Sequence, residues 1–187
     1  MAEHVCPWWL GYLLVSPLRR AFQNPARILA PYVRAGATVV EAGPGMGFFT
    51  LDLARLVGPS GRVVAVDVQS RMLEALRRRV AKAGLADRIE TRLVQPSSLG
   101  VGDLTGQADF VLAFAVVHEF PDARTFFAEA AASLRPGGAL LLAEPTGHVS
   151  AGVFEDELRA AAAAGLTARE RPTIRRSRSA LLVRSGP

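Results

Sequence analysis

The sequence predicts an α/β fold: a doubly wound, mostly parallel sheet of seven strands, with helices on both faces and an antiparallel hairpin at the C-terminal end. Three observations support this prediction. From residue 36 onward, short apolar runs and helical stretches alternate five times. Most connections are long enough for the right-handed crossovers that parallel strands need. The last link, residues 174–178, is too short for a crossover and favours an antiparallel pair.

Strands are expected where apolar or β-branched residues run together. The run RVVAVD at 62–67 is continuous and rich in Val, which is typical of a strand buried on both faces. Two extended runs near the end of the sequence supply the hairpin. The expected strands span residues 38–41, 62–67, 89–94, 108–115, 139–143, 167–173 and 179–184.

Helices are expected where apolar residues recur at helical spacing. Ser70 should cap the second helix and Gly84 should end it, while Asp122 should cap the third. The expected helices span residues 49–57, 70–83, 122–134 and 150–164.

Composition limits the classes of function. A chain of 187 residues suits one domain, which we place at 34–187. Hydrophobic residues make up 50% and charged residues 21%, which excludes a disordered chain. The net charge of +5 permits anionic partners but identifies none. The single cysteine, Cys6, excludes a disulfide framework and an all-cysteine zinc site, and it fits the cytoplasm, where we expect the protein to act.

The N-terminal segment, residues 1–33, is expected to form a helical cap or lid. Its apolar stretch at 7–15 is shorter than the roughly 20 residues that a membrane-spanning helix needs, so no transmembrane segment is expected. Trp8, Trp9 and Tyr12 would pack within this cap. The alternative is an interfacial helix, because aromatic side chains also anchor helices at membrane surfaces.

A glycine-rich loop lies between the first expected strand and the first expected helix. It reads GPGMG at residues 43–47. Glycine lets the backbone approach a ligand closely, and open α/β sheets bind ligands beyond the carboxyl ends of their strands. Phe48 stands where a dinucleotide fingerprint needs glycine, and no G-K-[ST] follows, which argues against a nicotinamide, flavin or P-loop site. Taken alone, the loop would also fit a structural turn.

Asp67 ends the second expected strand, twenty residues after Gly47. Its two carboxylate oxygens suit the vicinal hydroxyls of a ribose. The alternative role is to cap the helix that begins near Ser70. We favour ribose binding, because the loop and the acid end two consecutive strands.

Three motifs, in this order, resemble class I S-adenosylmethionine-dependent methyltransferases. They are E-x-G-x-G-x-G at 41–47, VVAVD at 63–67 and LRPGGxLLLAEP at 134–145. By architecture the resemblance covers about residues 34–187. It implies a seven-stranded sheet with a final antiparallel hairpin, S-adenosylmethionine as the cofactor and S-adenosylhomocysteine as the product.

The resemblance also implies cofactor contacts by position. Glu41 and the glycine loop would line the methionine and ribose part, Asp67 would hold the ribose hydroxyls, and Val68 would lie beside the adenine. After the third strand the family often carries an acidic residue, whereas this chain has QPSS, where Gln95 or Ser97 would meet the adenine edge. The residues expected to bind the cofactor are Glu41, Gly43, Pro44, Gly45, Gly47, Phe48, Asp67, Val68, Gln95, Pro96, Ser97 and Phe114.

Methyl transfer from a sulfonium has a neutral leaving group, so positioning does most of the work and no catalytic triad is needed. A base is needed only when the nucleophile carries a proton. In the methyltransferase family that this sequence resembles, the segment after the fourth strand contributes substrate contacts. In this chain the segment holds His118 and Glu119. We expect His118 to accept the proton. Glu119 would orient the His118 side chain or bind a cationic substrate. The alternative is that both side chains only stabilise their loop.

A metal or metalloid site is a further alternative. A thiolate and imidazoles could hold a soft metal, and the residues concerned are His4, Cys6, His118 and His148. The spacing of the first two is not diagnostic. No metal ligand is therefore expected, and Cys6 is interpreted as a small buried hydrophobe.

The predicted function is methyl transfer to a small-molecule acceptor. Arginines in the last two strands could instead contact RNA, although charged side chains also protect a solvated hairpin from aggregation. These arginines are Arg169, Arg171, Arg175, Arg176, Arg178 and Arg184. One alternative is therefore an RNA-modifying methyltransferase, although nucleic acid is not the favoured partner. The other is a non-catalytic cofactor-binding or scaffold protein. The oligomeric state is not predicted.

Overall fold

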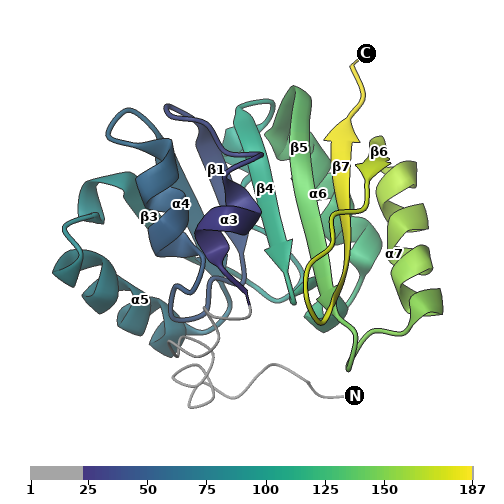
Figure 1. The fold of residues 1–187 in the computed structure, drawn as a ribbon, viewed down its shortest axis with the longest axis horizontal. Coiled ribbons are helices and arrows are strands. Elements are labelled where there is room, and N and C mark those ends of the chain that lie inside the picture. The colour runs from purple at the N-terminus through teal and green to yellow at the C-terminus, as the bar shows by residue number, and fades with distance from the viewer. Residues whose placement is uncertain (1–22, 187) are drawn as a thin grey trace. The chain divides into compact units, whose positions relative to one another are not determined.

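The computed structural model describes residues 23–186 (Figure 1). Its strands form a seven-stranded sheet in the order β3-β2-β1-β4-β5-β7-β6. The pairs β1–β2, β2–β3 and β4–β5 are parallel, whereas β7 runs antiparallel to β5 and β6. The predicted α/β fold, with its mostly parallel sheet and final antiparallel hairpin, is therefore confirmed. Trp8, Trp9 and Tyr12 of the expected cap lie outside the described residues.

The chain divides into two compact units, residues 1–94 and 95–187. In the first unit, α4 packs against β1 and β2, and α5 packs against β2 and β3. The apolar stripe of α5 is buried beneath it, whereas its other face is charged. The elements described in this unit are α3 (Pro25–Leu29), β1 (Thr38–Ala42), α4 (Thr50–Val57), β2 (Arg62–Asp67), α5 (Ser70–Lys82), η2 (Ala86–Arg88) and β3 (Ile89–Leu93).

The start of α5 corrects one expectation. Ser70 is the first residue of the helix rather than its cap, and the cap position belongs to Gln69, whose side chain makes no capping hydrogen bond. The backbone amide of Gln69 instead donates to the Asp67 carboxylate at 2.9 Å. A serine before a helical stripe signals a helix start only to within a residue or two.

The second unit holds the rest of the sheet, with α6 packed against β5 and α7, and α7 beside the β6–β7 hairpin (Figure 1). Asp122 caps α6 as predicted, because its Oδ1 accepts the Arg124 amide at 3.0 Å. The elements are η3 (Gly102–Leu104), β4 (Ala108–Phe114), η4 (Val117–Glu119), α6 (Ala123–Ser133), β5 (Leu134–Pro145), α7 (Ala151–Ala163), β6 (Leu166–Glu170) and β7 (Ser177–Arg184).

Strand β5 is much longer than the predicted 139–143. Ala108 pairs with Leu134, but Phe110 pairs with Ala139, so the chain between Leu134 and Ala139 bulges out of register. Gly137 adopts the positive φ of 73° that this bulge contains. The RPGG sequence at 135–138 was expected to end the helix at 122–134 and to link it to the strand at 139–143. Instead the chain continues in the same strand after the bulge. The residue types of this segment are equally compatible with a turn that leaves the sheet, so the local sequence does not distinguish the two cases.

The central strands are buried in each unit, as their apolar sequences predict. β1 and β2 contribute valines with almost no exposed surface, and β4 and β5 contribute Phe110 and a run of leucines. Within residues 23–186, none of the helices is both long enough and apolar enough to cross a membrane.

Candidate functional site

The glycine loop at 43–47 follows β1 and is anchored to both neighbouring elements of its unit. The Gly43 amide donates to the Val66 carbonyl at 2.9 Å, and the Arg79 guanidinium donates to the Met46 carbonyl. Pro44 is buried between these anchors. The loop is therefore tied to the end of β2 and to α5.

Two glycines of this loop serve different purposes. Gly47 has a φ of 87°, and a Cβ placed there would lie 2.4 Å from Leu76 Cδ1 in α5. Gly45 also has a positive φ, 54°, but a Cβ there would meet no atom within 4 Å. Gly47 thus permits close packing against the helix, whereas Gly45 faces open space where a ligand can approach the backbone.

Asp67 lies at the carboxyl end of β2 and joins this end to the loop. Its Oδ2 accepts the Gly45 amide at 3.2 Å, and its Oδ1 accepts the Gln69 amide. Asp67 is 8% exposed, and burial raises the pKa of its carboxyl, although the hydrogen bonds from Gln69 and Gly45 oppose this change. The two oxygens accept the backbone amides of Gly45 and Gln69 and keep further acceptor capacity, which a pair of hydroxyls could use.

The capping alternative for Asp67 is present in part, because Gln69 directly precedes α5. The hydrogen bond to Gly45 is different, since Gly45 lies 22 residues earlier in the chain. A cap alone does not require that contact. The hydrogen bond from Gly45 fixes the position of the loop relative to the Asp67 carboxylate.

Glu41 lies on β1 and is 2% exposed. Burial raises the pKa of this carboxyl to about 8, the Thr50 hydroxyl lowers it and the charge of Asp67 raises it further. The Glu41 carboxyl is thus neutral at pH 7. Its Oε2 and the Thr50 Oγ1 are buried and make no hydrogen bond of ordinary geometry within residues 23–186. Such buried polar atoms call for an explanation, and a bound polar group is one.

The other expected cofactor residues are distributed over both units. In the first, Val68 is half-buried beside Asp67, and the buried Phe48 ring packs edge-on against Phe49 at 5.0 Å between centroids. In the second, Phe114 is buried at the end of β4. Exposed residues at the start of the second unit are Gln95, Pro96 and Ser97.

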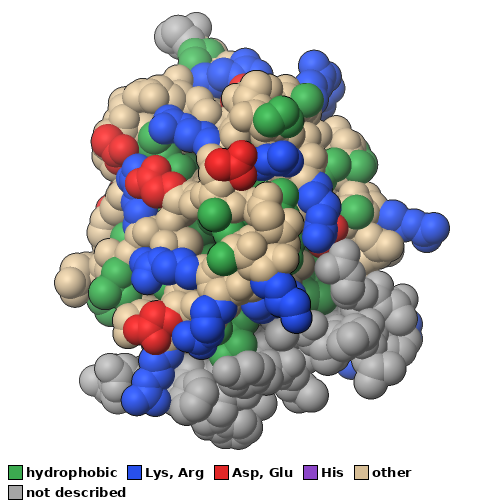
Figure 2. Space-filling model, turned by 90° about the vertical axis from the view of Figure 1, so that its left-hand side faces the viewer, with side chains coloured by type: hydrophobic (Ala, Val, Ile, Leu, Met, Phe, Trp, Pro, Cys, Tyr) green, Lys and Arg blue, Asp and Glu red, His purple; other side chains and the backbone are tan. Residues whose placement is uncertain are grey.

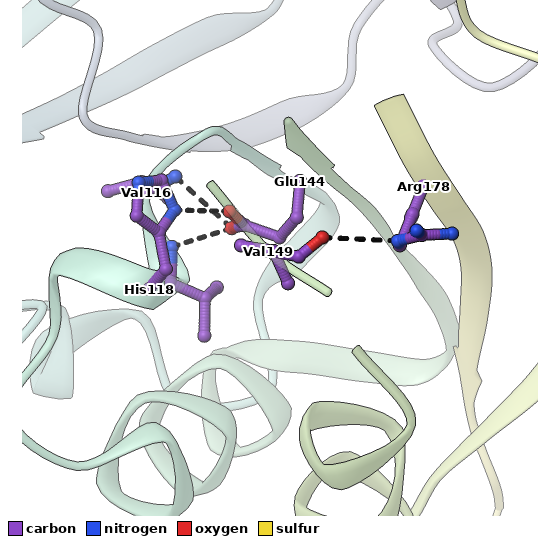
Figure 3. Close-up of polar contacts among 6 residues, drawn as sticks. Val116, His118, Glu144, Val149 and Arg178 are labelled. Carbon is purple, nitrogen blue, oxygen red and sulfur yellow. Dashed lines mark hydrogen bonds and ion pairs between the residues drawn. The ribbon is translucent and has the colours of Figure 1, made fainter. Parts of the chain in front are cut away.

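A second cluster of titratable groups lies within the second unit, after β4 (Figure 3). Glu144, on β5, is fully buried. Its Oε1 accepts the Val117 amide at 2.8 Å and the Val116 amide at 3.2 Å, and its Oε2 is hydrogen-bonded to Nδ1 of His118. The η4 turn that carries His118 is therefore fastened to β5 through one carboxylate.

The electrostatics of this cluster follow from burial and from three neighbouring carboxyls. Burial lowers the pKa of His118, but the hydrogen bond to Glu144 and the charges of Glu144, Glu119 and Glu157 outweigh this, so the pKa is raised. Burial and the charge of Glu144 raise the pKa of Glu157 to about 8, against an opposing effect of His118. Glu157 is 5% exposed, and its Oε2 has no hydrogen-bond partner in the described part of the chain.

Sequence reasoning did not identify Glu144 and Glu157. It gave Glu119 the role of orienting His118 or of binding a cationic substrate, and in the structure the carboxylate bonded to Nδ1 is that of Glu144. Glu144 lies in the LLLAEP motif, where an acid follows a run of buried apolar residues, and this pattern is a usable signal. Glu157 carries no comparable signal, because its charge is ordinary for an amphipathic helix.

The metal alternative has little support from the described residues. The rings of His118 and His148 lie edge to face, with centroids 5.8 Å apart. Within residues 23–186, no three His, Cys, Asp or Glu side chains are arranged to hold a metal ion. His4 and Cys6 lie outside these residues.

Comparison with known proteins gives both sequence relatives and a structural neighbour. A ubiquinone/menaquinone biosynthesis C-methyltransferase UbiE of Hahella chejuensis is 36% identical over 112 residues, 60% of this chain and 44% of the relative. An arsenite methyltransferase of Halobacterium salinarum is 33% identical over 121 residues, 65% of this chain and 30% of the relative. The chain thus spans less than half the length of these two relatives.

A crystal structure of a SAM-dependent methyltransferase from Aquifex aeolicus has a TM-score of 0.84 to this chain. It is 22% identical, and the match covers 96% of this chain and all of the other. This likeness shows the fold.

The family described as "Methyltransferase domain" matches residues 39–138. This range exceeds half of the chain and includes the glycine loop, Asp67 and His118. The motifs at 41–47 and 63–67 fall within it, in the expected order. The chain therefore belongs to the class I S-adenosylmethionine-dependent methyltransferase family.

Proposed function

We propose that this chain binds S-adenosylmethionine and transfers its methyl group to a small molecule. The observation that carries the proposal is the Asp67 carboxylate, which ends β2 and accepts the amides of Gly45 and Gln69 in a chain of this family. This arrangement presents two fixed acceptor oxygens beside an open glycine backbone. A ribose diol beside the loop matches it.

The residues of the first unit fit such a cofactor. Asp67 would accept the two ribose hydroxyls, and Gly45 would allow the ligand to approach the loop backbone. The neutral carboxyl of Glu41 would meet a polar group of the cofactor, which would satisfy its buried Oε2. Val68 would lie beside the adenine. When bound, S-adenosylmethionine supplies a methyl group on a sulfonium centre, and its departure leaves a neutral thioether.

In the proposed reaction, the residues of this chain bind, orient and remove a proton. Positioning the acceptor in line with the methyl group supplies most of the rate enhancement. An acceptor that carries a proton on its nucleophilic atom also needs a base, and we assign that role to His118. The His118 side chain is 19% exposed, so it is not fully enclosed by the described residues. Glu119, on the same turn, would contact a cationic acceptor.

The small-molecule class of acceptor is part of the proposal. The two sequence relatives described above are named for a quinone pathway and for arsenite, both of which involve small acceptors. The arginines of the hairpin, which could contact RNA, are partly used in local structure. Arg171 pairs with Glu155 at 2.7 Å, and Arg178 donates to the Val149 carbonyl at 3.1 Å.

The basic side chains on the side of the molecule that carries helix α5 also have acidic neighbours. In Figure 2, basic side chains on the visible face are interspersed with acidic and apolar ones and form no continuous field. Arg92 of β3, for example, pairs with Glu90 at 2.7 Å. Mixed charge of this kind is typical of a solvated surface rather than of a phosphate-tracking groove.

Methyl transfer with a radiolabelled cofactor tests the proposal. The protein is incubated with methyl-labelled S-adenosylmethionine and a cell extract, which is then separated into small molecules, RNA and protein. We expect label in the small-molecule fraction, and much less label there with the Asp67→Ala variant at a cofactor concentration near the Kd of the parent. Label in RNA or protein would contradict the acceptor class. Cofactor binding with no label in any fraction would support a non-catalytic protein.

A further inference from the structure

Three hydrogen bonds reach the Glu144 carboxylate from residues in the described part of the chain. Oε1 accepts two backbone amides, those of Val116 and Val117, and Oε2 is bonded to His118 Nδ1. Backbone amides can only donate, so Oε1 acts as an acceptor for both. An ionised carboxylate in that position has only acceptor atoms to offer His118, and Nδ1 must carry the proton of their hydrogen bond.

The consequence for the imidazole concerns its other nitrogen. In neutral imidazole, a proton on Nδ1 leaves the lone pair on Nε2. Glu144 is fully buried, whereas 19% of the His118 side chain is exposed. The buried carboxylate is bonded to Nδ1 (Figure 3), and the imidazole has the larger exposed fraction of the two side chains. The ring of His148 lies edge to face with the ring of His118.

We propose that Glu144 is a positioning residue for His118, which holds the Nδ1–H tautomer and fixes the η4 turn so that Nε2 is the proton acceptor. This inference rests on the proposed methyl transfer. During the reaction, the acceptor's proton moves to the Nε2 lone pair, and its bonding electrons remain on the nucleophilic atom. The imidazolium that forms is stabilised by the adjacent carboxylate.

Other charged groups near His118 modulate this pair. Glu119 lies on the same turn, and Glu157 on α7 influences the proton affinity of the imidazole. Burial and the charge of Glu144 raise the pKa of Glu157 to about 8. At the start of α6, which packs against η4, the charges are those of Asp122 and Arg124. His148 is in ring contact with His118, and Arg178 donates to the Val149 carbonyl.

The tautomer can be measured in the unmodified protein. The chain has only three histidines, so nitrogen NMR of protein labelled at its imidazoles is readily resolved, and His118→Gln assigns the signal. Above the titration midpoint of His118, we expect the proton on Nδ1. A proton on Nε2 would overturn the proposal, and this test does not depend on any methyl acceptor or on the folding of a variant.

The Glu144→Gln variant tests the role of the charge. If the carbonyl of the introduced side-chain amide keeps the two backbone amides, its NH₂ group faces Nδ1, which must then accept, and the proton moves to Nε2. We expect this tautomer switch, at least a tenfold loss of proton affinity at His118, and a fall in kcat of about 100-fold or more with little change in KM for the cofactor. An unchanged tautomer together with an unchanged pH profile of kcat would overturn the proposal.

Glu155→Gln is the matched control, because it makes the same substitution on the same unit at an exposed residue that pairs with Arg171. We expect it to change neither the His118 signal nor kcat. If the parent transfers no methyl group, the proposed function fails, but the tautomer and the titration still decide whether Glu144 holds His118. If Glu144→Gln does not fold, the measurement on the parent decides.

Discussion

The Asp67→Ala substitution removes the carboxylate that we assign to the ribose. In the structure this carboxylate is 8% exposed and already fixed by the Gly45 and Gln69 amides, so it needs no reorganisation to bind a diol. A hydrogen bond to a charged group contributes roughly 1.5–3 kcal/mol. Two such bonds contribute about 3 kcal/mol at the low end, which corresponds to about a 100-fold change in Kd.

The substitution should leave the fold intact. It removes the carboxylate that accepts the backbone amides of Gly45 and Gln69, which costs roughly 1–3 kcal/mol for each donor left without a partner. Part of this cost is offset, because burial already opposes ionisation of Asp67, as its raised pKa indicates. Circular dichroism and thermal unfolding of Asp67→Ala check that the chain is still folded.

The assay is isothermal titration calorimetry with S-adenosylhomocysteine. Asp67→Ala should bind about 100-fold more weakly than the parent, and Asp67→Asn, which keeps one acceptor oxygen, should bind about tenfold more weakly. Asp87→Ala is the control, because Asp87 is an exposed aspartate of the same unit whose contact with Arg88 is long, at 3.9 Å. Equal affinities for Asp67→Ala and the parent would refute the ribose assignment.

Two further substitutions test the first unit through its stability. Gly47→Ala should lower the free energy of unfolding by about 2 kcal/mol or more, because its Cβ meets the buried Leu76 and its φ is positive, whereas Gly45→Ala should cost about 1 kcal/mol from φ alone. Equal urea midpoints for the two variants would contradict this packing argument. Glu41 keeps its proton in the native state up to about pH 8 but loses it near pH 4.5 when unfolded, so it makes the protein less stable as pH rises through that window. Glu41→Gln should remove this part of the pH dependence, so its stability relative to the parent should rise from pH 5 to pH 8; a constant difference across these pH values in urea unfolding would show that Glu41 is not buried as a neutral acid.

Much of the fold was predictable because its signals are local and repeated. The valine-rich run at 62–67 and the short final link specify a buried strand and an antiparallel hairpin, and both are present. The length of β5 was not predictable in this way. Whether Gly137 and its neighbours end a strand or form a bulge depends on the partner strand, which the local sequence does not contain.

The site residues likewise differ in whether the local sequence identifies them. The loop and Asp67 were identified because they follow consecutive strands, and the structure joins them through the Gly45 amide. Glu144 was missed because its importance depends on a contact with a turn 26 residues earlier. Its one local signal is an acid at the end of a buried apolar run. Glu157 depends even more on tertiary context, since only its burial near Glu144 makes its charge unusual.

The most direct test of the account is a crystal structure of this protein with S-adenosylhomocysteine. We predict that the adenosyl group lies against the 43–47 loop, with the two ribose hydroxyls within hydrogen-bond distance of the Asp67 carboxylate oxygens. Density for the ligand elsewhere, or a ribose that does not contact Asp67, would contradict it.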